Sequence, residues 1–146
     1  MKKVVIGSDH AGFALKEVIK RAFGETFEFI DVGTDSEASV DYPVYAEKVG
    51  RAVAKDSDAL GILVCGSGIG MSIAANKIRG IRAALAYSQN AARLSREHNH
   101  ANVLVLPGRE ATMDTPLDIV RAFLDTIFSE EERHARRVRE IKKLEK

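Results

Sequence analysis

The chain has 146 residues, of which 45% are hydrophobic, and this is enough for one domain with a sizeable core. Its 22 lysines and arginines nearly balance its 21 aspartates and glutamates, which argues against nucleic acid or a membrane surface as the main partner. The single cysteine cannot form an internal disulfide, and the apolar runs are too short for a secretory signal or a membrane span. We therefore expect a soluble, cytoplasmic domain covering residues 1–146.

Short apolar runs alternate with segments of helical periodicity along the chain. The runs predict strands over residues 3–7, 27–31, 59–64, 81–86 and 102–106, and the segments between them predict helices near residues 11–23, 43–55, 69–77, 88–98 and 114–128. Strands that are apolar throughout are buried on both faces of a sheet. The pattern predicts a three-layer, doubly wound, Rossmann-like α/β fold with a five-stranded parallel sheet. By analogy with such folds, we expect the strand order 2-1-3-4-5.

The C-terminal segment, from about residue 130 to 145, differs from the rest because it is densely charged. It predicts one last helix, which Ser129 and Glu132 would open with the spacing of a capping box. Its apolar stripe is thin and consists of Val138, Ile141 and Leu144. We expect this helix to pack along the body of the domain or against a second subunit.

Two loops follow strands that would be neighbours at the switch point of the sheet. The first strand runs into GSDHAG and the third into CGSGIG. Ligands of doubly wound folds bind in the crevice at this edge. We therefore expect Asp9, His10, Cys65 and Ser67 to share one crevice.

The glycines of CGSGIG can turn backbone N–H groups toward an anion at the start of the next helix. Met71 stands where a dinucleotide fingerprint needs its third glycine and where a thiol phosphatase needs arginine, and a P-loop lysine is absent. A phosphoacceptor receiver domain would have aspartate in place of Cys65. Two interpretations of the thiol remain open. It is a small buried hydrophobe, or the helix start lowers its pKa and makes it a base or nucleophile.

Seven blocks of sequence carry a family resemblance. They are GSDHAGFALK, DVGT, DYP, CGSGIGMSIAANKIRGIRAA, LSREHNHANVL, PGR and RHARRV. In this order they resemble the B-type ribose-5-phosphate isomerases of the RpiB/LacAB family of sugar-phosphate isomerases. The resemblance implies a flavodoxin-like domain that forms dimers or tetramers and interconverts aldose and ketose phosphates without metal or other cofactor. It favours ribose 5-phosphate and ribulose 5-phosphate of the pentose phosphate pathway, with allose or galactose 6-phosphate as alternatives.

The resemblance also implies roles for individual residues. Cys65 would be the base that moves a proton between C1 and C2 through a cis-enediolate, and His98 the acid that opens the sugar ring. The Ser67 hydroxyl would orient Cys65 or the substrate. Further contacts with the substrate are implied for Asp9, His10, Tyr42, Gly66, Gly68, Ile69, Gly70, Asn99, Arg109, Arg133 and Arg137.

The histidines and arginines of the second half of the chain add two constraints. Arg133 and Arg137 are four residues apart and so share one helix face, where two guanidinium groups can bind one phosphate. Without the resemblance, the two arginines would be interpreted as part of a solvated basic helix face. His134, which lies between them in the sequence, has no assigned role. His98 and His100 are two apart and no ligand spacing completes a site, so we expect no metal.

The predicted topology separates His98 from Cys65. The helix over residues 88–98 begins at the edge that carries Cys65 and runs back roughly 15 Å. We therefore expect a homodimer, or a dimer of dimers, in which each subunit lends His98 and Asn99 to its partner's site. A noncatalytic sugar-phosphate or nucleotide binder stays open as an alternative, as does a nucleic-acid-binding module that uses the basic tail.

Overall fold

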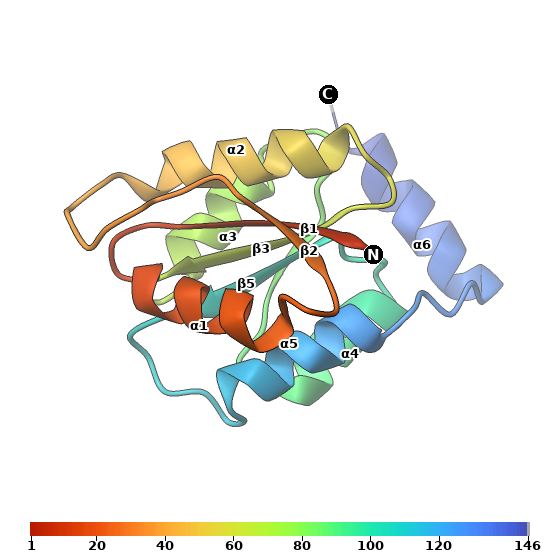
Figure 1. The fold of residues 1–146 in the computed structure, drawn as a ribbon. Coiled ribbons are helices and arrows are strands. Elements are labelled where there is room, and N and C mark those ends of the chain that lie inside the picture. Colours follow the sequence, from red (N-terminus) through yellow and green to blue (C-terminus); the bar gives the residue numbers. More distant parts are fainter. Residues whose placement is uncertain (146) are drawn as a thin grey trace.

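Five parallel strands form one sheet in the computed structural model, which describes residues 1–145 (Figure 1). The strands are β1 (Lys3–Ser8), β2 (Glu28–Asp31), β3 (Leu60–Cys65), β4 (Ala83–Leu85) and β5 (Val103–Pro107). The helices are α1 (Phe13–Phe23), α2 (Tyr42–Ala54), α3 (Ile69–Ala75), α4 (Gln89–Glu97), α5 (Pro116–Asp125) and α6 (Glu132–Lys143). The doubly wound α/β fold predicted from the sequence is confirmed.

The order of the last two strands differs from the expectation. The sheet runs β2-β1-β3-β5-β4, with β5 between β3 and β4, whereas we expected 2-1-3-4-5. The reason lies in the composition of the two strands. All five residues of β5 (VLVLP) are buried, as a central strand requires, whereas β4 has only three residues (AAL), each half-buried, and suits an edge.

Alternate residues of the strands feed two cores, one on each face of the sheet. Val4, Ile6 and Leu104 belong to a core covered by α1, α4 and α5. Val5 and Val105 point to the other face, where α2 and α3 complete the second core. Figure 1 shows these helices as layers on either side of the sheet. Within residues 1–145, no helix has both the length and the apolar character needed to cross a membrane.

The last helix, α6, lies apart from both layers, beside the amino ends of the strands (Figure 1). It begins at Glu132 with Glu131 as its N-cap, so the predicted capping box at Ser129 is wrong. The Ser129 hydroxyl instead accepts a hydrogen bond from the Glu131 N–H at 3.4 Å, before the helix starts. On α6 only His134 and Val138 are buried, and beyond them Leu144 is 76% exposed. The thin apolar stripe of α6 is thus only partly covered by its own chain.

Candidate active site

Three loops meet at the carboxyl edge of the sheet, after β1, β3 and β5. The Asp9 N–H donates to the Val64 carbonyl at 3.2 Å, which ties the first loop to the end of β3. The Arg109 N–H donates to the Gly66 carbonyl at 3.0 Å, which ties the third loop to the second. The loops that carry Asp9 and Cys65, which were expected to share one crevice, are therefore adjacent within one chain, and the loop that carries Arg109 lies beside them.

The CGSGIG loop is held in one conformation by its glycines and by a tyrosine. Gly68 has a left-handed φ of 82°, and a Cβ there would lie 2.5 Å from Leu85 Cδ1. The Ser67 hydroxyl accepts a hydrogen bond from the Ile69 N–H at 3.2 Å. The backbone carbonyl of Ser67 accepts one from the Tyr87 hydroxyl at 2.6 Å. Tyr87 was not among the predicted site residues, because nothing in its local sequence indicates that it reaches this loop.

The Cys65 side chain is buried and surrounded by backbone N–H groups. Burial raises the pKa of this thiol above its ordinary value of 9.0, and the nearby Asp9 carboxylate raises it further. The N–H groups of Met71, Gly68 and Gly66 act against this rise but do not outweigh it. Of the two interpretations left open by the sequence, the one in which the helix start lowers this pKa is not supported, because desolvation is the larger effect. In the free subunit Cys65 is a thiol at neutral pH.

Asp9 lies near this thiol, His10 follows Asp9 in the same loop, and Tyr42 packs on the CGSGIG loop from α2. The Asp9 carboxylate is buried and accepts a hydrogen bond from the Gly12 N–H at 3.0 Å. His10 Nδ1 accepts from the N–H of residue 40, at 3.2 Å. Tyr42, at the start of α2, packs over Gly70, where a Cβ would lie 2.4 Å from Tyr42 Cζ. The structure thus places Tyr42 against the CGSGIG loop.

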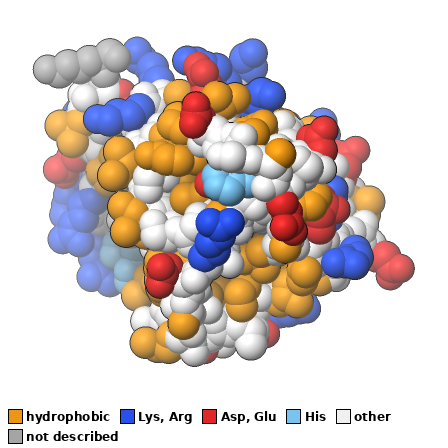
Figure 2. Space-filling view, turned by 90° about the vertical axis from the view of Figure 1, so that its left-hand side faces the viewer, with side chains coloured by type: hydrophobic (Ala, Val, Ile, Leu, Met, Phe, Trp, Pro, Cys, Tyr) orange, Lys and Arg blue, Asp and Glu red, His pale blue; other side chains and the backbone are white. Residues whose placement is uncertain are grey.

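Figure 2 views the molecule from this carboxyl edge. A histidine lies near the middle of the face, and hydrophobic side chains gather around it between acidic and basic ones. Among the exposed hydrophobic residues are two on α3, one within the CGSGIG stretch and one just after it. These are Ile69 and Ile73, with 55% and 59% of their surface exposed. The rim of the crevice is thus partly apolar.

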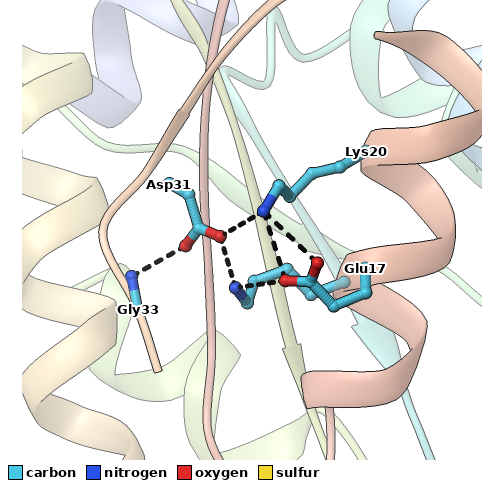
Figure 3. A network of polar contacts seen from close by, with 5 residues as sticks. Glu17, Lys20, Asp31 and Gly33 are labelled. Atoms are coloured by element: carbon cyan, nitrogen blue, oxygen red, sulfur yellow. Dashed lines mark hydrogen bonds and ion pairs between the residues drawn. The ribbon is translucent and has the colours of Figure 1, made fainter. Parts of the chain in front are cut away.

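An ion-pair network supports the end of β1 (Figure 3). Asp31 Oδ2 lies 2.5 Å from Lys16 Nζ and 2.7 Å from Lys20 Nζ, while its Oδ1 accepts from the Gly33 N–H at 2.8 Å. The Gly33 carbonyl in turn accepts from the Ser8 N–H at 2.9 Å, one residue before Asp9. The sequence-based prediction missed this network. The available signal was Lys16 itself, a lysine on the apolar face of α1, where it is only 1% exposed.

The remaining predicted residues lie at the opposite edge of the sheet. His98 caps the C-terminus of α4, and its ring stacks on that of His134 with the centroids 4.1 Å apart. Nearby, at the start of β3, the Gly61 N–H donates to the carbonyl of residue 102. Gly61 precedes Cys65 by four residues along this strand, which corresponds to about 13 Å. The prediction that His98 does not reach Cys65 of its own chain is confirmed.

Arg133 and Arg137 lie with His98 at this opposite edge, on α6 (Figure 1). Arg133 Nε lies 3.3 Å from a carboxylate oxygen of Glu131. Arg137 forms no ion pair with any residue of the described range 1–145. A cavity of about 810 Å³ between α3, β4 and α6 is lined by Asn99 but not by Cys65. One chain therefore carries the predicted site as two separate halves.

The domain carries a thiol surrounded by backbone N–H groups at the carboxyl edge of its sheet, and two arginines on its last helix. Proton transfer on a phosphorylated substrate requires groups of these two kinds. The family model described as Ribose/Galactose Isomerase, LacAB_rpiB, matches residues 4–141. The chain belongs to this family.

Named relatives are similar over almost the whole chain. Ribose-5-phosphate isomerase B of Escherichia coli (strain K12) is 44% identical over 146 residues, covering 99% of this chain and 97% of that protein. The crystal structure of a ribose 5-phosphate isomerase from Thermotoga maritima has a TM-score of 0.90 and 51% identity, covering 97% of both chains. The structure of ribose-5-phosphate isomerase B from Mycoplasma genitalium with bound ribulose-5-phosphate has a TM-score of 0.91 and 41% identity, covering 98% of this chain and 95% of that one.

Proposed function

We propose that this protein is an aldose–ketose isomerase that interconverts D-ribose 5-phosphate and D-ribulose 5-phosphate in the cytoplasm, as a step of the pentose phosphate pathway. The observation that carries the proposal is the buried Cys65 thiol, toward which three backbone N–H groups point. The similarity to an isomerase structure named for its bound ribulose-5-phosphate supports the choice of substrate.

Cys65 serves as the base of the isomerisation. Its thiolate removes the proton from C2 of the open-chain aldose, the C2–H electron pair forms the C1=C2 bond, and negative charge moves to O1. The hydroxyl proton then passes from O2 to O1, and Cys65 returns a proton to C1 to complete the ketose. The N–H of Gly70, in the first turn of α3, has no intrahelical acceptor and stabilises the enediolate oxygen. The Ser67 hydroxyl keeps this loop in place.

A second copy of the chain completes the site. The half of the site that contains Cys65 has no acid for ring opening and too few cationic groups to bind a phosphate. The residues proposed for these roles lie at the other end of the same chain; they are His98, Asn99, Arg133 and Arg137. A two-fold dimer, alone or within a dimer of dimers, brings the two halves together. The exposed apolar side chains on α3, beside Cys65, and at the end of α6 support this arrangement, because a partner subunit would cover them.

The partner's half performs the first step. His98 gives a proton to the ring oxygen as its bond to C1 breaks, and the C1 hydroxyl releases its proton to water, which leaves the open-chain aldehyde. Asp9 and Asn99 bind sugar hydroxyls. Arg133 and Arg137 bind the phosphate, together with Arg109 and His10 from the Cys65 half; Arg137 suits this role because its guanidinium is unpaired within residues 1–145.

Turnover of three sugar phosphates tests the proposal. Because the matching family is described as Ribose/Galactose Isomerase, galactose 6-phosphate is the second candidate substrate, and allose 6-phosphate is the third. We expect ribose 5-phosphate to give the highest kcat/KM in a coupled assay of the purified protein. A preference for either hexose 6-phosphate would overturn the pentose assignment. Tight binding of all three sugars without turnover would identify a noncatalytic binder instead.

A further inference from the structure

Two histidine rings lie face to face where the end of α4 meets the start of α6. The rings of His98 and His134 are inclined by only 9°, with their centroids 4.1 Å apart. Their exposure differs sharply. The His98 side chain is 36% exposed, whereas the His134 side chain is 7% exposed and forms the inner layer of the stack.

One nitrogen of the inner ring, Nε2, is left without a hydrogen-bond partner within residues 1–145. His134 Nε2 is buried and makes no hydrogen bond within the described chain, and its closest carboxylate is Glu131, at 3.5 Å. A buried polar atom without a partner destabilises a fold, and a flat apolar ring at this position would avoid that cost.

Burial and the surrounding charges both act on the pKa of the inner ring. From α4 the stack is faced by Glu97, whose carboxylate lies 3.8 Å from His98 Nε2. From the start of α6 it is faced by Glu131, Arg133 and Arg137. Burial lowers the pKa of His134, and the positive charges of His98, Arg133 and Arg137 lower it further, against the opposing effect of Glu131. Burial and the nearby cations thus favour the neutral form of His134.

We infer that His134 is a positioning residue for the ring-opening acid: its flat ring is the wall that sets His98 in register with Arg133 and Arg137. The inference rests on the proposed function and deepens it. His134 follows Arg133 directly and precedes Arg137 by three residues, so the wall and the phosphate-binding arginines share the first turns of α6.

The substrate explains why the acid is tied to this helix. In the furanose form of ribose 5-phosphate only three bonds separate the ring oxygen from the ester oxygen of the phosphate. A helix that binds the phosphate therefore fixes where the ring oxygen lies, and an acid braced on the same helix meets it. Misplacement of a reacting group by about 1 Å can cost about 100-fold in rate.

Two measurements on His134 variants test this role. The first is kcat/KM for ribose 5-phosphate, which requires ring opening. The second is exchange of the C1 hydrogen of ribulose 5-phosphate with D2O, which requires Cys65 but no ring opening, because this ketose carries phosphate on its C5 oxygen and cannot close a ring. In His134→Ala we expect kcat/KM to fall by about 10- to 100-fold, while exchange at C1 and inhibition by inorganic phosphate stay within about threefold of wild type.

Two further variants separate the flat ring from its nitrogen atoms and from the fold. His134→Phe restores the wall without a titratable group, and we expect it to recover most of the isomerisation. His134→Leu fills the space without a flat ring, and it replaces the alanine variant in the test if that variant does not fold. Arg136→Ala is the control on the same helix, because Arg136 pairs with Glu140 and has no part in the site; it should match wild type in both measurements.

Three results would overturn the inference. One is a His134→Ala protein with kcat/KM within twofold of wild type. Another is a parallel loss of isomerisation and C1 exchange, which would mean general damage to the site. The third is a His134→Phe protein as slow as His134→Ala, which would assign the role to the ring nitrogens. If wild-type protein neither isomerises ribose 5-phosphate nor exchanges the C1 hydrogen, the proposed function itself fails.

Discussion

Cys65 is the residue on which the proposed chemistry depends most directly. Replacement by alanine removes the base but only one small atom from the second core, so the fold should persist. We expect Cys65→Ala to lower kcat by about 10²- to 10⁴-fold, the usual contribution of a positioned general base. Steady-state kinetics together with circular dichroism measure the two effects. Alkylation of Cys65 should inactivate the wild-type enzyme, and substrate should protect it; near-normal turnover in the variant would remove Cys65 from the mechanism.

The raised pKa of Cys65 predicts how activity depends on pH. Because burial and the Asp9 charge hold this pKa above 9.0, less than about 1% of the free enzyme carries a thiolate at pH 7. Both kcat/KM and the rate of alkylation by iodoacetamide should therefore rise about tenfold per pH unit between pH 7 and pH 9. An alkylation rate that is already constant between pH 7 and pH 8 would show that the thiolate is stabilised in solution.

Arg137 provides a test of the phosphate site at the residue scale. Its guanidinium is unpaired within residues 1–145, so its removal breaks no structural ion pair there. We expect Arg137→Ala to raise KM for ribose 5-phosphate by about tenfold or more, with a smaller loss in kcat, because remote binding energy also positions the reacting carbons. Arg136→Ala, on the same helix, should leave both constants unchanged. Equal constants in Arg137→Ala and wild type would take α6 out of the site.

Among the secondary-structure elements, α1 and β2 are joined by the ion pair between Lys16 and Asp31. Lys16 is almost fully buried, so Asp31→Asn leaves its charge without its nearest partner and should cost about 3 kcal/mol of unfolding free energy near pH 7. Glu47→Gln is the matched control, since its pair with Arg51 is exposed and should cost less than about 1 kcal/mol. Urea denaturation measures both. A similar, small cost for the two variants would contradict the network's structural role.

The same pair predicts a dependence of stability on acid. Burial by itself would raise the pKa of Asp31, but hydrogen bonds from Lys16, Lys20 and the Gly33 N–H hold it below its ordinary 3.8. Its stabilising contribution is therefore complete above pH 3.8 and is lost as the pH falls through the lowered pKa of the folded state. The stability difference between wild type and Asp31→Asn should be constant from pH 7 to about pH 5 and shrink below pH 3.8. A difference that grows on acidification would have the wrong sign.

The elements also show how far the sequence alone leads. Apolar runs located every strand, because burial on both faces of a sheet leaves a local signal. The order of β4 and β5 was not predictable from position in the chain, although the continuous apolar character of VLVLP favours the centre of a sheet. The start of α6 was misplaced because a capping-box spacing at Ser129 competes with a helix that actually begins at Glu132.

The candidate site was predictable where it depends on strand ends. Asp9 and Cys65 follow β1 and β3, and parallel strands deliver their ends to one edge. Contacts set by distant parts of the chain left no such signal. The His98–His134 stack joins residues 36 positions apart in the sequence, and the pKa of Cys65 depends on how deeply the folded core buries it.

At the scale of the whole molecule, the two halves of the proposed site lie at opposite edges of the sheet in one chain. A monomer with this arrangement would be inactive, because its Cys65 base would have no ring-opening acid beside it. In a two-fold dimer the same arrangement supplies two complete sites. The central claim is therefore that the catalytic unit requires two chains.

Complementation between two inactive variants tests that claim most directly. Cys65→Ala and His98→Ala subunits are mixed in equal amounts, unfolded, refolded together and assayed, with mass measurement to confirm mixed dimers. Under random pairing about half of the dimers are mixed, and each has one intact site, so activity should recover to about a quarter of wild type per subunit. Mixed dimers that form and remain inactive would contradict the shared site and return His98 to its own chain or remove it from the mechanism.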